Sequence, residues 1–123
     1  MSAHRLITSW AFLALIAGCD AGSPRLQGTW IGERADGMPS DQQVQANTFV
    51  TSTKITFHRN VVTIETAGQS SKGRYRVLSD SGSTVVVAAP SDPDPQTFER
   101  VGERRLKWIL ADGRAMLFMK QDR

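Results

Sequence analysis

The chain has 123 residues, a formal net charge of +3 and a single cysteine. This length suits one domain with a small hydrophobic core, and one cysteine excludes both an internal disulfide and a multi-cysteine metal site. The 15 Lys and Arg residues are nearly balanced by 12 Asp and Glu residues and are scattered through strand-like segments, a pattern that does not indicate nucleic acid binding.

The chain begins like a targeting segment. His4 and Arg5 form a short basic start, and an apolar run follows from Leu6 to Ala17. The chain then becomes polar and contains the helix-breaking Gly22-Ser23-Pro24 stretch. A membrane-spanning helix needs about 20 predominantly apolar residues, which this run does not reach. The order of basic, apolar and small residues is typical of a cleaved signal peptide.

Ile16-Ala17-Gly18-Cys19 ends this segment and resembles the lipobox of bacterial lipoprotein precursors. The resemblance implies cleavage before Cys19, acyl chains such as palmitate on that cysteine, and anchoring in a membrane. The alternative is a free or buried thiol that happens to follow small residues. We therefore expect a signal peptide over residues 1–18, a lipidated N-terminus with a short tether over 19–25, and one domain over 26–123.

Asp20 directly follows this cysteine. Lipoproteins of enteric-type bacteria resemble one another in using aspartate at this position to avoid export to the outer membrane. The resemblance therefore implies a cell membrane lipoprotein on the periplasmic side, with the inner membrane favoured. An outer-membrane location stays open, because Asp20 also suits an ordinary polar linker.

The residues from Leu26 to Glu33 alternate as a first strand. Its Gly28-Thr29-Trp30 triplet resembles the Gly-x-Trp of lipocalin-like barrels, which implies that Trp30 closes one barrel end. The alternative is a tryptophan packed in any small β-sheet. Between Arg34 and Ser52, Ser40 and Gln43 are spaced as in a capping box, and we expect one loose turn or an irregular crossover that acts as a lid.

The clearest hairpin has its turn at Arg59-Asn60. It pairs Phe57 with Val62 and Ile55 with Ile64 on one face, so that His58 points outward as a solvated histidine and not as a metal ligand.

A second hairpin joins Lys72–Ser79 to Thr84–Ala89 through Ser81-Gly82. The expected register places Tyr75 and Val77 on one face with Val86 and Ala88. The proline-rich stretch from Ala89 to Pro95 is then a stiff connection.

The last hairpin is predicted at Asp112-Gly113, a strong two-residue turn signal. It sets Leu110 opposite Ala115, Trp108 opposite Leu117 and Leu106 opposite Met119. The other face then carries the candidate interface residues Ile109, Met116 and Phe118. Exposed together, these three residues mark an interaction patch; alternatively they pack beneath the segment from Ser40 to Ala46.

About eight short strands with tight turns predict an all-β fold, a small antiparallel up-and-down β-barrel. No nucleophile stands beside a base, so we expect no catalytic residues, cofactor or metal, and no enzyme. We expect a lipid-anchored envelope lipoprotein, a lipocalin-like module for a small hydrophobic or amphipathic ligand. Its interior is predicted to be lined by Trp30, Phe57, Tyr75 and Trp108.

The alternative is a filled barrel that serves as a protein-interaction or assembly lipoprotein and presents Met116 and Phe118 to another envelope protein. Cavity volume separates the two hypotheses, because pockets for drug-sized ligands begin at about 300 Å³. A third hypothesis, inhibition of a periplasmic hydrolase, depends on the rigid loop from Pro90 to Pro95.

Overall fold

The computed structural model describes residues 22–90 and 94–121, so the predictions for Cys19 and Asp20 lie outside the described residues. Within the described ranges there is one short α-helix, α2 (Gln43–Thr51), one 3₁₀ turn, η1 (Ala111–Gly113), and a single sheet of nine strands. The strands are β1 (Gly28–Asp36), β2 (Thr53–His58), β3 (Val61–Thr66), β4 (Gln69–Arg74), β5 (Arg76–Asp80), β6 (Thr84–Ala88), β7 (Gln96–Val101), β8 (Arg105–Ile109) and β9 (Ala115–Lys120).

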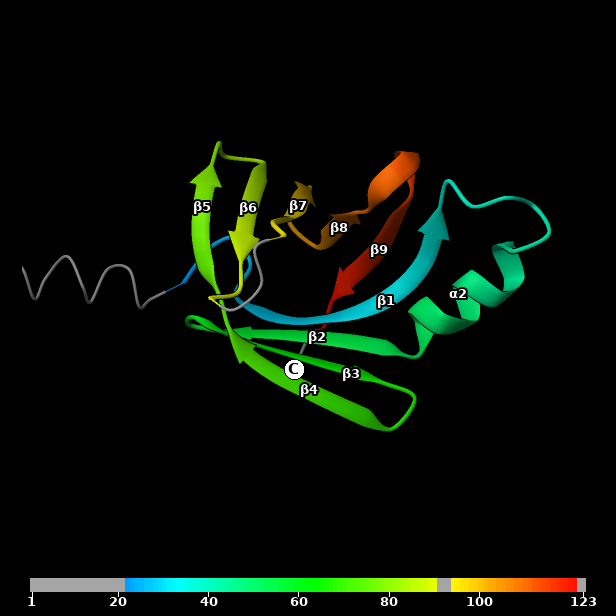
Figure 1. Ribbon diagram of the computed structural model, residues 1–123, viewed down its shortest axis with the longest axis horizontal. Helices are drawn as coiled ribbons and strands as arrows, with labels where there is room; N and C mark the ends of the chain where they lie inside the picture. The colour runs from blue at the N-terminus through cyan, green and yellow to red at the C-terminus, as the bar shows by residue number, and fades with distance from the viewer. Residues whose placement is uncertain (1–21, 91–93, 122–123) are drawn as a thin grey trace, which may run out of the picture.

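The strands form an antiparallel meander that returns on itself. Their order is β4-β3-β2-β1-β9-β8-β7-β6-β5, so the first strand pairs with the last and the sheet curls into a nearly closed barrel (Figure 1). The predicted antiparallel β-sheet architecture is confirmed, as a nearly closed barrel accompanied by one short helix. The strand number is nine instead of about eight, because the predicted strand from Lys72 to Ser79 is divided at Tyr75 into β4 and β5.

The barrel remains open along one line, between β4 and β5. These strands stand at the two ends of the sheet order, although only Tyr75 separates them in the chain. They diverge from this residue, β5 rising toward the top of the view and β4 running toward the lower right (Figure 1). In the described part of the chain no ladder joins them. We call this opening the seam.

The β2–β3 hairpin has the predicted register. Phe57 is opposite Val62 and Ile55 is opposite Ile64. Phe57 and Ile55 are buried, while His58 is exposed at the strand end. The hydrophobic alternation is strong here and only two residues connect the strands, so the pattern alone fixes the register.

The predicted register of the β8–β9 hairpin is wrong by one residue. Trp108 pairs with Met116 and Leu106 with Phe118. The turn is not the two-residue type but a three-residue loop, η1, closed by the hydrogen bond from the Leu110 N–H to the Arg114 carbonyl. Asp112 has a positive φ of 61° within it, as in three-residue hairpin loops that end in a bulge.

This shift removes the predicted interface. A slip of one residue moves alternate side chains to the opposite face of a sheet, and Phe118 and Met116 are accordingly 0% and 9% exposed, in the hydrophobic core. Only Ile109 reaches the surface, with 37% exposure. The alternative of packing near the segment from Ser40 to Ala46 is closer to the structure, since Ala46 packs against the same core.

The β5–β6 hairpin also departs from its predicted register. Val77 pairs with Val87, not with Val86 or Ala88, and a bulge falls between Val77 and Ser79. Val85, Val87 and Ala88 are the buried residues of β6, and Val85 and Val87 belong to the core cluster. Apolar residues occupy both faces of this hairpin, so alternation does not specify one register.

The segment predicted as a loose turn contains a nine-residue helix, α2, which begins three residues after Ser40 and has no side-chain cap. Its sizeable apolar residues Val44 and Phe49 are exposed, and Val50 is the buried anchor. Val50 packs so close to Gly32 of β1 that a Cβ on this glycine would collide with the Val50 carbonyl. The helix therefore stays in contact with β1 at a position that only glycine permits.

The residues before β1 belong to the folded domain. Ser23 and Leu26 are buried, and the Ser23 N–H donates to the Tyr75 hydroxyl over 3.0 Å. The predicted tether over 19–25 is therefore too long at its end, because its part from Gly22 onward packs against the barrel. The prediction treated these small and polar residues as a linker and missed the buried partners that they find.

Candidate functional site: an aromatic pocket at the barrel seam

The centre of the barrel is filled by side chains. Trp30, Leu106 and Phe118 are each 0% exposed and belong to one core cluster. The Trp30 indole N–H donates to the Leu26 carbonyl over 2.8 Å. Trp30, predicted to line a ligand cavity, is thus a core residue that lines neither of the hollows described below.

A small apolar cavity opens at the seam and has a volume of about 110 Å³. We call it the seam pocket. It lies between the inner faces of β2, β3 and β4 on one side and of β6, β7 and β8 on the other. Its lining residues are the aromatic Phe57, Tyr75, Phe98 and Trp108, the aliphatic Ile55, Val62, Ile64, Val87, Ala88 and Ala89, and the polar Arg74 and Gln96.

The four aromatic rings form a continuous wall. Phe57 meets Tyr75 and Phe98 edge to face, with ring centroids 5.5 Å apart in both pairs. Phe98 lies over Trp108 with centroids 5.2 Å apart. Such contacts hold rings in fixed positions, so the wall is preformed.

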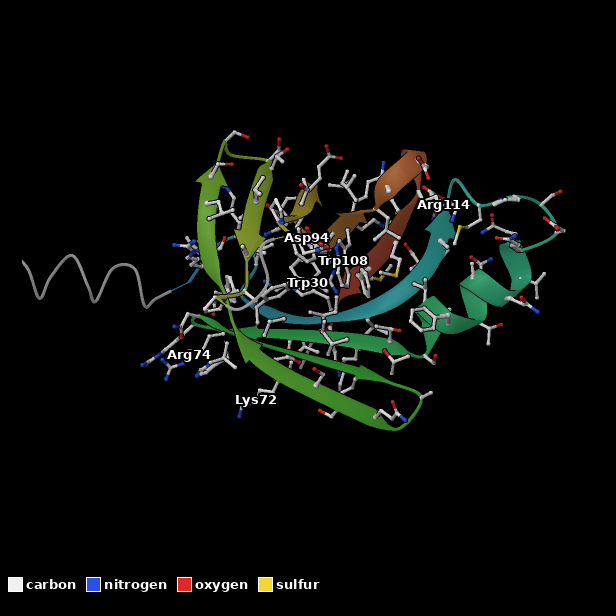
Figure 2. The ribbon with its side chains drawn as sticks, viewed as in Figure 1. Trp30, Lys72, Arg74, Asp94, Trp108 and Arg114 are labelled. Carbon is white, nitrogen blue, oxygen red and sulfur yellow. The ribbon has the colours of Figure 1, made fainter. Side chains whose placement is uncertain are left out.

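Two polar side chains, those of Gln96 and Arg74, also line the pocket. The Trp108 indole N–H donates to the Gln96 side-chain carbonyl over 3.0 Å, and Arg74 contributes from the end of β4. Figure 2 shows Trp108 within the barrel and Arg74 beyond the end of β4. An apolar pocket with few polar groups at its edge is typical of a site for an amphipathic molecule.

A second, wider hollow lies between α2 and the β3–β4 hairpin, with a volume of about 670 Å³. Most of its lining residues have polar side chains, although the carbon atoms of these residues supply much of its surface, and Phe49 is its one exposed aromatic residue. Ile64 lines both hollows. The two hollows are therefore neighbours along the concave face of β3.

Tyr75 lines the pocket and also connects the β2–β3 turn to the residues before β1 through its hydroxyl. Its hydroxyl donates to the Arg59 carbonyl over 2.7 Å and accepts from the Ser23 N–H and, over 3.3 Å, from the Gln27 side chain. Burial disfavours the phenolate and raises the pKa of Tyr75 above its usual 10.0, although the hydrogen bonds from Ser23 and Gln27 act in the opposite direction.

This raised pKa predicts alkaline destabilisation. Below pH 10 the hydroxyl is protonated in both states and its contribution is complete. Above the pKa of the unfolded chain only the unfolded state loses the proton, so the free energy of unfolding falls until pH passes the native pKa. The chain has one tyrosine; its ultraviolet absorbance is therefore expected to titrate above pH 10 in the native protein and near 10 in denaturant. A native midpoint at or below 10 would contradict this prediction.

The structure brings together three of the four predicted ligand residues. Phe57, Tyr75 and Trp108 line the seam pocket, whereas Trp30 does not. The prediction from sequence did not include Phe98, which is opposite Trp108 in the pairing of β7 with β8. It also missed Arg74, because nothing in the sequence marks the strand division at Tyr75 that brings the end of β4 to the pocket.

Among the described residues, no group of three or more His, Cys, Asp and Glu side chains gathers as a metal site would require. Over the same ranges, no helix has the length and apolar character needed to cross a membrane. Comparisons with protein-family models, with curated proteins and with solved structures found no match.

Proposed function

We propose that this chain is a lipid-anchored lipoprotein of the bacterial cell envelope that binds a small amphipathic ligand by one apolar group. The lipobox-like Ile16-Ala17-Gly18-Cys19 supports the anchor, and Asp20 favours retention at the inner membrane on its periplasmic side. The aromatic seam pocket supports the binding step and is the observation on which this function depends.

The pocket volume limits the size of the bound group. At about 110 Å³ the pocket is well below the roughly 300 Å³ of sites that hold drug-sized ligands. It is nearer to the apolar cavity of about 150 Å³ that accepts benzene. One ring or a short alkyl segment fits, while the rest of the ligand lies outside near Arg74 and Gln96.

The proposal predicts retention of a ligand by the mature, lipidated protein. Native mass spectrometry of full-length lipoprotein, extracted from its own host with a neutral detergent, is expected to show an added mass that unfolding releases. The same added mass should appear after extraction with a second detergent of different mass, since a bound detergent would change with it.

Two neighbouring valines of β3 provide a matched pair of variants. Val62 lines the pocket and is half-buried, whereas Val61 is half-buried and lies outside it. Val62→Phe is expected to fill the pocket and to abolish the added mass, whereas Val61→Phe is expected to retain it. An added mass that persists in Val62→Phe places the ligand elsewhere, and a wild-type protein without any added mass argues against ligand binding.

The second candidate function is a filled-barrel lipoprotein that binds another envelope protein. Its support is the small pocket volume together with the unpaired outer edges of β4 and β5. A free edge accepts an extended segment of a partner as an added strand, although Lys72 and Arg74 supply the charges with which edge strands resist uncontrolled pairing. Cross-linking from β4 in intact cells tests this function.

A further inference from the structure

We propose that the barrel end at which the chain enters is a contact surface for anionic lipid headgroups, formed by Arg59, Arg74 and Arg76. We call these residues the basic end. This inference rests on the proposed lipid anchor at Cys19 and adds which side of the domain faces the membrane.

The three arginines come together through Tyr75. Arg74 ends β4 and Arg76 begins β5, so they flank this tyrosine on both sides. The tyrosine N–H donates to the Asn60 carbonyl over 2.8 Å and its hydroxyl donates to the Arg59 carbonyl over 2.7 Å. The β2–β3 turn that carries Arg59 is therefore bonded to the junction between the other two arginines.

No carboxylate in the described part of the chain compensates the charge of the basic end. Each of its three arginines is exposed, and among residues 22–90 and 94–121 no carboxylate lies within 4.0 Å of their guanidinium groups. Asp80, at the other end of β5, is held by Arg25 over 3.0 Å. Positive charge without a partner is available to an external anion.

The anchor lies next to this end. Gly22 rests against the Arg59 carbonyl and the Tyr75 hydroxyl so closely that a Cβ would collide with both. Cys19 is three residues earlier, and three extended residues span at most about 10 Å. That distance is close to the screening length of about 8 Å at physiological ionic strength, so headgroups around a lipidated Cys19 would be within electrostatic reach.

The opposite end differs in charge. Asp36 at the end of β1, Asp41 before α2 and Asp112 in η1 lie there, and Figure 1 shows α2 and η1 on the side of the barrel away from chain entry. Arg34, which lies 3.3 Å from Asp36, and Arg114, which follows η1, also belong to this end. Its charges are therefore mixed, and an anionic surface attracts the basic end more strongly. When the basic end faces the membrane, the edge of the seam pocket at Arg74 lies at the headgroup layer.

The test uses full-length lipidated protein in vesicles. Lipidation consumes the only native cysteine, so an engineered cysteine is a unique labelling site for an environment-sensitive fluorophore. Asn60→Cys reports from the basic end and Ala111→Cys, in the exposed η1 turn, reports from the opposite end. Vesicles of phosphatidylcholine with phosphatidylglycerol are expected to shift the emission at Asn60→Cys to the blue and to leave Ala111→Cys unchanged, and high salt should reverse the shift.

Two sets of charge-removing variants complete the test. Near an anionic surface each arginine contributes about fivefold to the contact equilibrium. Arg59→Gln with Arg74→Gln and Arg76→Gln should therefore weaken contact by about a hundredfold, and Arg74→Gln with Arg76→Gln by about 25-fold. Lys107→Gln with Arg114→Gln makes the same change in net charge as this double variant, at positions outside the basic end, and is expected to preserve the shift.

The possible failures are distinct. If Cys19 carries acyl chains and both probes respond alike, or the shift is the same in vesicles without phosphatidylglycerol, the orientation is wrong although the anchor stands. If Cys19 carries no lipid, the anchor fails, and this inference fails with it. A circular dichroism melt of each variant establishes that the emission change does not come from unfolding.

Discussion

Trp30→Ala is expected to lower the free energy of unfolding by about 3 to 5 kcal/mol, the range for removing a buried large aromatic side chain. The indole is completely buried, its N–H donates to the Leu26 carbonyl over 2.8 Å, and Arg100 lies 5.2 Å from the ring centroid. The truncation removes packing and leaves that carbonyl without its partner. Because the domain is small, such a loss is a large part of its total stability.

Chemical denaturation measures this effect. Phe49→Ala is the control, because Phe49 is 54% exposed on α2 and its truncation is expected to change stability by about 0.5 kcal/mol or less. Trp30→Phe, which keeps an aromatic ring and loses the N–H donor, should fall between wild type and alanine. Equal denaturation midpoints for wild type and Trp30→Ala would contradict the placement of this tryptophan in the core.

The parts of the fold that the sequence predicted are those in which local pattern and turn agree. In the β2–β3 hairpin the alternation of Ile55 and Phe57 is matched by that of Val62 and Ile64, and a two-residue turn joins the strands. Only one register then turns all four side chains toward the core. The antiparallel meander itself follows from the succession of such short strands.

The errors occurred where one residue decides the outcome. Asp112-Gly113 satisfies the rule for a two-residue turn, yet the chain forms a three-residue loop that pairs Leu110 with Arg114 and buries Phe118 and Met116. Apolar residues at successive positions of β9 satisfy either register locally. In the observed register Phe118 is opposite Gly32 of β1, a pairing between the ends of the chain that no local pattern contains.

For a similar reason, the sequence predicted several aromatic residues of the candidate site but not the pocket between them. Phe57, Tyr75 and Trp108 were identified because large aromatic residues on alternating strands point inward. The pocket between them depends on the division of a strand at Tyr75, whose N–H and hydroxyl both bond to the β2–β3 turn, at Asn60 and Arg59. These contacts span about fifteen residues of sequence, and such non-local contacts are not reported by strand propensity.

Cys19→Ser is expected to abolish lipid incorporation and to leave the precursor uncleaved, since the proposed lipobox requires the thiol. Each buried CH₂ of an acyl chain contributes roughly 0.8 kcal/mol to membrane affinity, so the variant should lose its acyl-chain anchor altogether. Metabolic labelling with a radioactive or clickable palmitate, followed by gel electrophoresis, measures both effects. Asp20→Ser is the matched control: labelling and cleavage should persist, and only the distribution between inner and outer membranes should change.

If the wild-type protein is cleaved to its mature size but carries no lipid, the lipobox prediction is wrong. The consequence for the domain is geometric, because Gly22 is already packed against the barrel and only three residues lead back to Cys19. A lipid at that cysteine therefore holds the barrel within about 10 Å of the headgroups. A cleavage without lipid would free the same chain end, and the Arg59, Arg74 and Arg76 charges would then have no nearby surface to meet. The anchor is thus the condition under which the basic end and the seam pocket act at a membrane.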